Sequence, residues 1–94
     1  MNMSQEQLQF KKFVEANAPK VAALFDWKKR EVIFSRVDNY LKFASSGEDM
    51  LTRFLVGVWL HDNKYGFDMI SAVKRLDTRY LNIIYKWLNK PIWP

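Results

Sequence analysis

Residues 53–77 read RFLVGVWLHDNKYGFDMISAVKRLD, and this stretch decides the fold. It opens with the longest apolar run of the chain, from Phe54 to Leu60. Together with the residues just before it, this run places apolar side chains at three- and four-residue spacing, which predicts one buried face of a helix. Val56 and Trp59 lie off that face. We therefore expect a central helix, at about residues 47–61, that is buried on more than one side.

Two features mark the start and the interior of this helix. Ser46 and Asp49 have the spacing of a capping box, in which both side chains accept backbone N–H groups of the first turn. Gly57 costs about 1 kcal/mol relative to alanine in a helix interior. We interpret Gly57 as the place where a neighbouring helix approaches closely.

A turn follows at residues 61–66. Gly66 adopts positive φ without steric cost, and Asn63 tolerates it better than most residues. Asp68 is then suited to N-cap a short helix that reaches about residue 75, and Asp77 to N-cap a last helix that reaches about residue 89. The last helix has apolar residues on two sides, so it is either wedged deep in a bundle or half exposed for a partner.

The first half of the chain predicts three more helices. Ser4 begins a second capping box, before a helix over about residues 5–16. A short helix is expected over residues 19–25, after a proline that interrupts the first one. Asp26 can cap a longer helix over residues 27–44, which carries the cleanest amphipathic pattern of the chain. Strand signals are nearly absent.

These elements predict an all-α fold, with one compact domain over residues 1–94 built of five or six short helices. A chain of 94 residues makes a single domain, and a hydrophobic content of 49% supports a modest core. Two prolines preclude a helix over residues 90–94. We expect this tail to fold back onto the bundle, with an exposed anchor for a partner as the alternative.

The composition indicates a cytoplasmic protein. The chain has no cysteine, which excludes disulfides and cysteine-ligated zinc. Residues 1–12 lack the apolar core of a signal peptide, and no window approaches the ~20 apolar residues of a membrane span. The net charge of +5 favours an acidic partner, but it is spread along the chain as on an ordinary solvated surface.

Part of the central stretch resembles a known group of proteins. The residues concerned are Ser46–Gly47, Arg53–Trp59, Gly66–Met69 and Leu76–Asp77. Their pattern is similar to one in short uncharacterised bacterial proteins of plasmids, integrative elements and phage-like regions. The resemblance covers residues 46–77. It implies a setting on a mobile element and no particular chemistry.

No motif for catalysis, for a metal or for a cofactor emerges from the sequence. His61–Asp62 is the one candidate acid–base pair, but adjacent residues on a helix point in different directions. We interpret His61 as a helix-end residue whose side chain meets the last free carbonyl groups. The three glycines form no phosphate-binding loop. We therefore expect a protein that is not an enzyme, with no catalytic residue, no cofactor and no metal site.

Two hypotheses for the function remain. The first is a protein-interaction or accessory module that binds another protein through the aromatic residues Tyr80, Trp87 and Trp93. The alternative is a small DNA- or RNA-binding protein, whose candidate contacts are the basic residues Lys28, Lys29, Arg30, Lys74, Arg75 and Arg79. In that case the turn at Gly66 would belong to a helix-turn-helix. A membrane partner is not expected, and homo-oligomerisation is compatible with both hypotheses.

Overall fold

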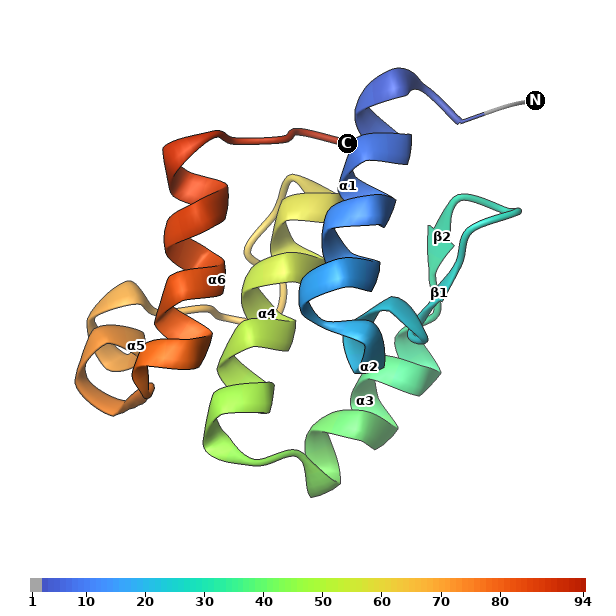
Figure 1. Cartoon of the computed structure of the whole chain (residues 1–94). Helices are drawn as coiled ribbons and strands as arrows, with labels where there is room; N and C mark the ends of the chain where they lie inside the picture. Colours follow the sequence, from blue (N-terminus) through green and yellow to red (C-terminus); the bar gives the residue numbers. More distant parts are fainter. Residues whose placement is uncertain (1–2) are drawn as a thin grey trace.

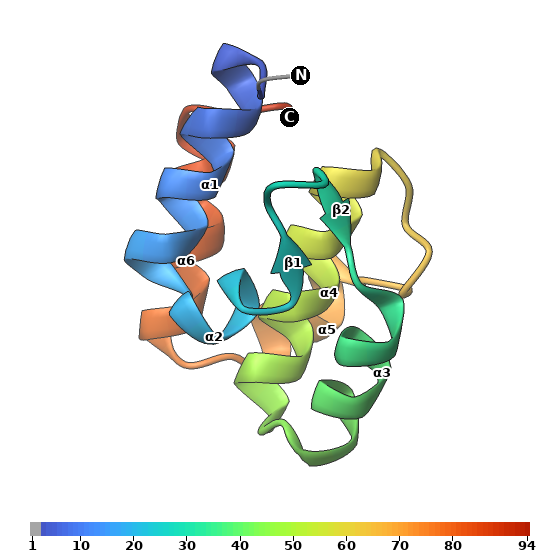
Figure 2. The same cartoon turned by 90° about the vertical axis from the view of Figure 1, so that its right-hand side faces the viewer.

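Helix α4 (Ser46–Leu60) runs through the middle of the molecule. The computed structural model describes residues 3–94. α6 (Thr78–Asn89) and α1 (Gln5–Asn17) appear to the left and right of α4 in Figure 1 and both to its left in Figure 2, so the three helices form a triangle. α1 runs in the opposite direction to the other two helices. This arrangement buries α4 on more than one side, as its apolar pattern predicts.

The remaining elements surround these three helices. α3 (Phe34–Phe43) and α5 (Met69–Arg75) pack against α4, and α2 (Pro19–Ala22) packs against α1. Between α2 and α3 lies an antiparallel hairpin of β1 (Phe25–Asp26) and β2 (Glu31–Val32), which Figure 2 shows in front of α4. The described residues form six helices and this small hairpin, so the predicted all-α class with five or six short helices is confirmed.

The core is one continuous cluster of buried side chains. Leu55 and Val56 of α4 are fully buried, as is Phe10 of α1. Thr52 is equally buried although it is polar, and its hydroxyl donates to the Glu48 carbonyl at 2.7 Å. An unpaired buried hydroxyl would cost free energy, and this hydrogen bond avoids that cost at Thr52.

Side-chain caps begin α1, α5 and α6 at the residues that the sequence predicts. Ser4 forms a capping box with Gln7 at the start of α1. Asp68 and Asp77 each accept the backbone N–H group three residues ahead, at 3.1 and 3.3 Å. These bonds satisfy N–H groups that have no partner inside the helix.

The predicted start of α4 is wrong by one residue. Ser45 is the N-cap: its hydroxyl accepts from the Glu48 N–H at 3.3 Å, and the Glu48 carboxylate accepts from the Ser45 N–H at 3.0 Å. Asp49, which the sequence pattern pairs with Ser46, instead binds Arg53, with Nε and Oδ1 2.6 Å apart. Two adjacent serines followed by two adjacent acids fit the capping-box spacing in either register, so the spacing alone cannot choose between them.

The helix predicted over residues 27–44 is wrong in its first half. The chain turns at residues 27–30, pairs as the hairpin, and enters α3 only at Phe34. Asp26 caps this turn and not a helix, because its Oδ1 accepts from the Lys29 N–H at 3.1 Å. The short helix predicted over residues 19–25 likewise ends at Ala22.

Aromatic packing explains the hairpin. Phe25 and Trp27 stack with their ring centroids 4.4 Å apart and their planes 10° from parallel. Both rings also contact Trp59 of α4 edge to face, at 5.4 and 5.5 Å. Residues two apart share a face in an extended chain but not in a helix. An extended backbone at residues 25–26 therefore brings both rings onto Trp59, which a continuous helix would not.

The glycines have different roles from the one predicted for Gly57. A Cβ on Gly57 would meet the Asp62 carbonyl at 3.4 Å, which belongs to the turn after α4 and not to a neighbouring helix. The close approach is at Gly47, where a Cβ would lie 2.5 Å from the Tyr80 ring of α6. Gly66 has a φ of 71°, as predicted for the turn. Gly47 thus lets α6 pack closely against the first turn of α4.

Helix α6 is half exposed, which is one of the two alternatives that its pattern allows. Ile83, Ile84 and Trp87 are buried against the core. Tyr85 and Leu88 point away from it: Tyr85 is 64% exposed and Leu88 is 47% exposed. One side of α6 therefore faces the core, and the side that carries Tyr85 and Leu88 is open to solvent.

The capping box at the start of α4 predicts different effects for two neighbouring serines. We expect Ser45→Ala to lower the free energy of unfolding by about 1 kcal/mol, because the Glu48 N–H loses its acceptor. The matched variant Ser46→Ala should change it by less than about 0.5 kcal/mol. Urea denaturation followed by circular dichroism measures both. Equal effects of the two variants would contradict the observed register.

We expect the charge of Glu48 to raise the free energy of unfolding by an amount that depends on pH. The backbone N–H of Ser45 and the ammonium of Lys20, which is 3.1 Å away, hold the pKa of Glu48 below its ordinary value. A carboxyl whose pKa is lower in the folded state stabilises the fold above its unfolded pKa, and this stabilisation is lost as the pH falls through the folded pKa. Gln can replace Glu in a capping box, so Glu48→Gln removes mainly the charge.

We therefore expect wild type to be more stable than Glu48→Gln at about pH 7, and the difference to shrink below about pH 4. Urea denaturation of both proteins across this range measures the difference. A difference that is the same at neutral and acid pH would show that the Glu48 charge does not stabilise the fold.

Candidate functional site

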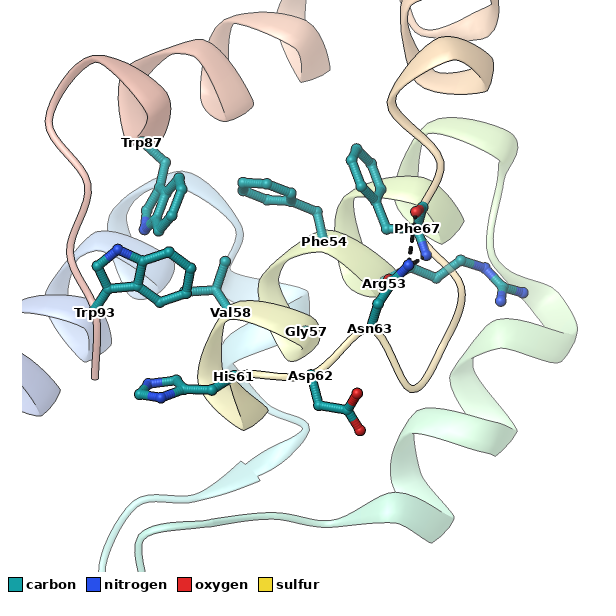
Figure 3. A pocket seen from close by; sticks show the side chains of 10 residues that line it. All are labelled: Arg53, Phe54, Gly57, Val58, His61, Asp62, Asn63, Phe67, Trp87 and Trp93. Atoms are coloured by element: carbon teal, nitrogen blue, oxygen red, sulfur yellow. Dashed lines mark hydrogen bonds between the residues drawn. The ribbon is translucent and has the colours of Figure 1, made fainter.

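A groove of about 500 Å³ opens beside the C-terminal end of α4 (Figure 3). Its walls come from α4, from the connection to α5 and from the end of α6 with the tail that follows. We call it the aromatic groove because five aromatic residues line it: Phe54, His61, Phe67, Trp87 and Trp93. Its other lining residues are Arg53, Gly57, Val58, Asp62 and Asn63.

The five rings form one connected series of edge-to-face contacts. Phe67 meets Phe54 at 5.1 Å between centroids, and Phe54 meets Trp87 at 5.3 Å. Trp87 then meets Trp93 at 4.9 Å, and Trp93 meets His61 at 5.5 Å. Such pairs contribute about 0.5–1.5 kcal/mol each beyond the area that they bury. The series therefore helps to hold the inner rings, Phe54, Phe67 and Trp87, in place in the free protein.

His61 ends α4 in a left-handed conformation, with φ 55° and ψ 34°. Its N–H donates to the Val58 carbonyl at 3.2 Å, and the Asp62 N–H donates to the Gly57 carbonyl at 3.1 Å. This pair of bonds is a Schellman motif, in which glycine is the usual left-handed residue. A residue with a Cβ costs roughly 1 kcal/mol or more there. The predicted place of His61 at the end of α4 is confirmed. The prediction directed its side chain at the last free carbonyl groups, whereas the ring packs edge to face against Trp93 at 5.5 Å.

Hydrogen bonds hold the connection between α4 and α5 against the groove. The Asn63 side chain accepts from the Phe67 N–H at 2.7 Å and donates to the Phe67 carbonyl at 3.1 Å, as the dashed lines in Figure 3 show. Arg53 donates to the Tyr65 carbonyl, and the Tyr65 hydroxyl donates to Asp38 at 3.1 Å. Burial and the bond to Asp38 raise the pKa of Tyr65. These bonds fix the Phe67 ring beside Phe54.

The tail after α6 folds back and forms the last wall of the groove. Trp87 is only 4% exposed, and its indole Nε1–H donates to the Ile92 carbonyl at 3.0 Å. Ile92 is partly buried against the core. The next residue, Trp93, reaches the groove but keeps 53% of its surface exposed. The structure therefore combines the two expectations for the tail, since Ile92 packs inward and Trp93 stays accessible.

The groove is apolar in its interior and polar at its edge. The side chains of Arg53 and Asn63 already form hydrogen bonds with Asp49 and with the connecting chain. They therefore have few hydrogen-bonding groups left for a ligand. His61 and Asp62 are exposed at the edge. Within the described part of the chain, no group of three His, Cys, Asp or Glu side chains is arranged to hold a metal ion.

Among residues 3–94, no helix is both long and apolar enough to cross a lipid bilayer.

The structure brings together two of the three residues predicted to form a protein interface. Trp87 and Trp93 meet in the aromatic groove, but Trp87 is buried and so supports the wall without presenting its ring to solvent. Tyr80 lies away from the groove, in a hollow beside Tyr40 and Glu48. Of these three residues, only Trp93 is both exposed and part of the groove.

The six basic residues predicted as nucleic-acid contacts lie in two separate places. Lys28, Lys29 and Arg30 form the tip of the hairpin, whereas Lys74 and Arg75 end α5. Arg79 in the first turn of α6 lies over its own Tyr80 ring, with its guanidinium carbon 4.5 Å from the centroid. Figures 1 and 2 place the hairpin and α5 on opposite sides of the molecule. These residues therefore do not make one basic face.

The connection between α4 and α5 also differs from a helix-turn-helix. It spans residues 61–68, which is longer than the roughly three to four residues of that motif. α5 itself has only seven residues.

The sequence did not identify most of the groove. The pattern places Phe54 and Val58 on the buried face of the central helix, and it gives Phe67 no structural role. Asn63 is a turn residue in the sequence, with no sign that its side chain would bracket Phe67. The one available signal was the number of aromatic residues at the C-terminal end, which pointed to Trp87 and Trp93.

In comparisons with known proteins, no family model, curated protein or solved structure matches this chain. The mobile-element setting that the resemblance of residues 46–77 implies therefore stays an expectation. A proposal for the function must therefore be based on the chemistry of the described residues.

Because the backbone at His61 is left-handed, a variant with glycine at this position should be more stable than one with alanine. Both His61→Gly and His61→Ala lose the contact with Trp93, so the difference between them isolates the backbone preference. We expect His61→Gly to exceed His61→Ala by about 1 kcal/mol in the free energy of unfolding. Urea denaturation measures both. Equal stabilities would show that residue 61 is not held in the left-handed conformation.

Proposed function

We propose that this protein is a non-enzymatic protein-interaction module, and that its aromatic groove receives apolar side chains of a partner protein. The observation that carries this proposal is the connected series of five rings around an open groove of about 500 Å³. Cavities of this size hold small ligands or a few side chains. Tryptophan and other aromatic residues in pockets supply most of the binding energy of many protein interfaces.

A protein partner fits the groove better than a small polar molecule does. Sites for small molecules place a few unpaired polar groups to orient the ligand. Here the groups of Arg53 and Asn63 already bind the protein's own chain. The edge residues His61 and Asp62 are open to solvent, as at the rim of a protein interface. Leucine, phenylalanine or tryptophan side chains can bury area against such walls without polar partners.

The rings are held before binding, which favours affinity. Edge-to-face contacts and the bonds to Phe67 and Ile92 fix the rings of Phe54, Phe67 and Trp87 in the free protein. A partner then does not have to order these side chains, which would otherwise cost about 0.5–1.5 kcal/mol for each mobile one. Trp93 is the exception, because it is half exposed and can adjust to the occupant.

The alternative, a DNA- or RNA-binding protein, has less support. Its six candidate residues lie on opposite sides of the molecule, so they cannot neutralise neighbouring phosphates on one stretch of backbone. We therefore place protein binding first.

A selection from random linear peptides displayed on phage tests the groove. We expect the selected peptides to be rich in Leu, Phe and Trp, and Trp93→Ala to weaken their binding about tenfold or more, since it removes an accessible wall. Phe43→Ala is the matched control, because Phe43 is 83% exposed and lies at the end of α3, outside the groove. Fluorescence anisotropy with synthetic copies of the peptides measures the affinities.

Two results would contradict this proposal. One is a selection that enriches no peptide. The other is a set of peptides whose affinity falls equally in Phe43→Ala and Trp93→Ala. Equal losses would show that the peptides bind exposed apolar side chains non-specifically and not the aromatic groove.

A further inference from the structure

A second hollow lies beside the first turns of α4, whereas the aromatic groove lies beside its C-terminal end. Its volume is about 260 Å³, and it shares no lining residue with the groove. The end of α1, the short helix α2, and helices α3, α4 and α6 all contribute to its walls. We call it the Tyr80 hollow, after the ring of α6 that packs against Gly47.

The deepest part of the Tyr80 hollow is apolar. Its buried lining consists of four aliphatic residues from four elements or their junctions: Ala18, Val21, Leu51 and Ile83. The volume is smaller than the roughly 300–1,000 Å³ of sites for drug-sized ligands. The hollow therefore has room for a compact apolar group and not for a large one.

Polar groups from four helices converge around this apolar lining. The Lys20 ammonium lies 3.1 Å from Glu48 Oε2, and Arg79 Nη2 donates to the Tyr80 hydroxyl at 2.9 Å. Partial burial raises the pKa of Tyr40, and the nearby Glu48 carboxylate and Tyr80 hydroxyl raise it further. These groups therefore face a common space. An apolar concavity with a few convergent polar groups and a shifted pKa is typical of a ligand site.

The unused hydrogen-bonding capacity of the hollow is cationic. Of the described residues that line it, Glu48 is the only acid, and its oxygens accept from the Ser45 N–H and the Lys20 ammonium. Lys20 and Arg79 each donate one of the hydrogen bonds described above, whereas an ammonium and a guanidinium carry several donors. Both side chains are exposed, so a ligand can reach their remaining N–H groups.

We propose that the Tyr80 hollow binds a small molecule that has one anionic group, a carboxylate or a phosphate, attached to a compact apolar body. The anionic group accepts charge-assisted hydrogen bonds from Lys20 and Arg79. The apolar body covers Leu51 and Ile83. This inference goes beyond the proposed function, because it concerns another site and another class of ligand.

Ligands of other charge fit the Tyr80 hollow less well. A cationic ligand needs a carboxylate with a free oxygen, but both oxygens of Glu48 already accept hydrogen bonds. It would also lie beside Lys20 and Arg79, which repel it. A neutral ligand gains the apolar contacts but leaves the donors of both cations unused.

Ligands that share a phenyl ring and differ in charge test this proposal. They are the anion phenylacetate, its uncharged amide and the cation phenethylamine. At about 0.15 M salt, we expect phenylacetate to bind the full chain about tenfold more tightly than phenylacetamide, and phenethylamine not to bind. NMR titration of the labelled protein measures the affinities, and the backbone signals of Val21 and Ile83 should shift. Phenyl phosphate in a parallel titration shows which anionic group binds more tightly.

Variants assign the binding to the Tyr80 hollow. We expect Lys20→Gln and Arg79→Gln each to weaken phenylacetate about fivefold or more, because each removes one cationic donor. The matched control Arg75→Gln lowers the net charge equally at the end of α5, outside the hollow, and should keep the affinity. Glu48→Gln should tighten phenylacetate, because it removes the acid that competes for Lys20.

Several results would overturn the proposal. Equal affinities for phenylacetate and phenylacetamide, or no tightening in Glu48→Gln, would show that the hollow does not recognise the anionic charge. Equal effects of Arg75→Gln and Arg79→Gln would assign binding to the net charge of the whole molecule. Binding that is lost in Trp93→Ala and kept in Arg79→Gln would place the phenyl ring in the aromatic groove. In that case the proposed function would stand and the inference about the Tyr80 hollow would not. Binding of neither anion would likewise reject it.

Discussion

The structure depends on the burial of α4 on several sides at once. Leu55 and Val56 are fully buried although they point in different directions, and Thr52 is buried with its hydroxyl satisfied inside the helix. A helix of this kind cannot lie on a surface, because each exposed apolar side would lose roughly 25 cal/mol for every Å² left in water. The rest of the chain must therefore wrap around it. α1, α6, α3 and the hairpin supply that cover (Figures 1 and 2).

The same constraint explains where the aromatic groove forms. α4 is covered by other helices along its length, but its last turn extends toward a connecting segment and a short tail. Neither has regular structure, so neither can fill the space beside Phe54 and Val58 as a helix would. Single rings fill it in part, and hydrogen bonds at Asn63 and Trp87 keep them there. An incomplete cover of the central helix is thus the physical origin of the groove.

Local signals in the sequence were sufficient for most of the fold. Ser4, Asp68 and Asp77 mark helix starts by chemistry that acts over three residues, and the structure places the caps there. The hairpin was missed because strands of two residues have no periodicity to detect. Its rings Phe25 and Trp27 pack on Trp59, which lies far along the chain from both. The register of the α4 capping box was ambiguous for a local reason, since either of two serines fits.

The groove could be predicted much less well. Phe54, Phe67 and Trp93 share no spacing, because they come together only when α4, the connecting segment and the tail have packed. The aromatic content of the C-terminal end indicated Trp87 and Trp93 but not which of the two is accessible. That distinction depends on packing: Trp87 is buried on the side of α6 that carries Ile83 and Ile84, and the tail that follows leaves Trp93 half exposed.

The four tryptophans of the chain fall into two pairs, and this gives the protein its own optical reporters. Trp27 and Trp59 lie 5.5 Å apart at the hairpin, and Trp87 and Trp93 lie 4.9 Å apart at the groove. Indole emission responds to the polarity around each ring. A protein with Trp27 and Trp59 replaced by phenylalanine would therefore emit only from the groove, and the reverse replacement only from the hairpin. Events at each place become visible separately, without an added label.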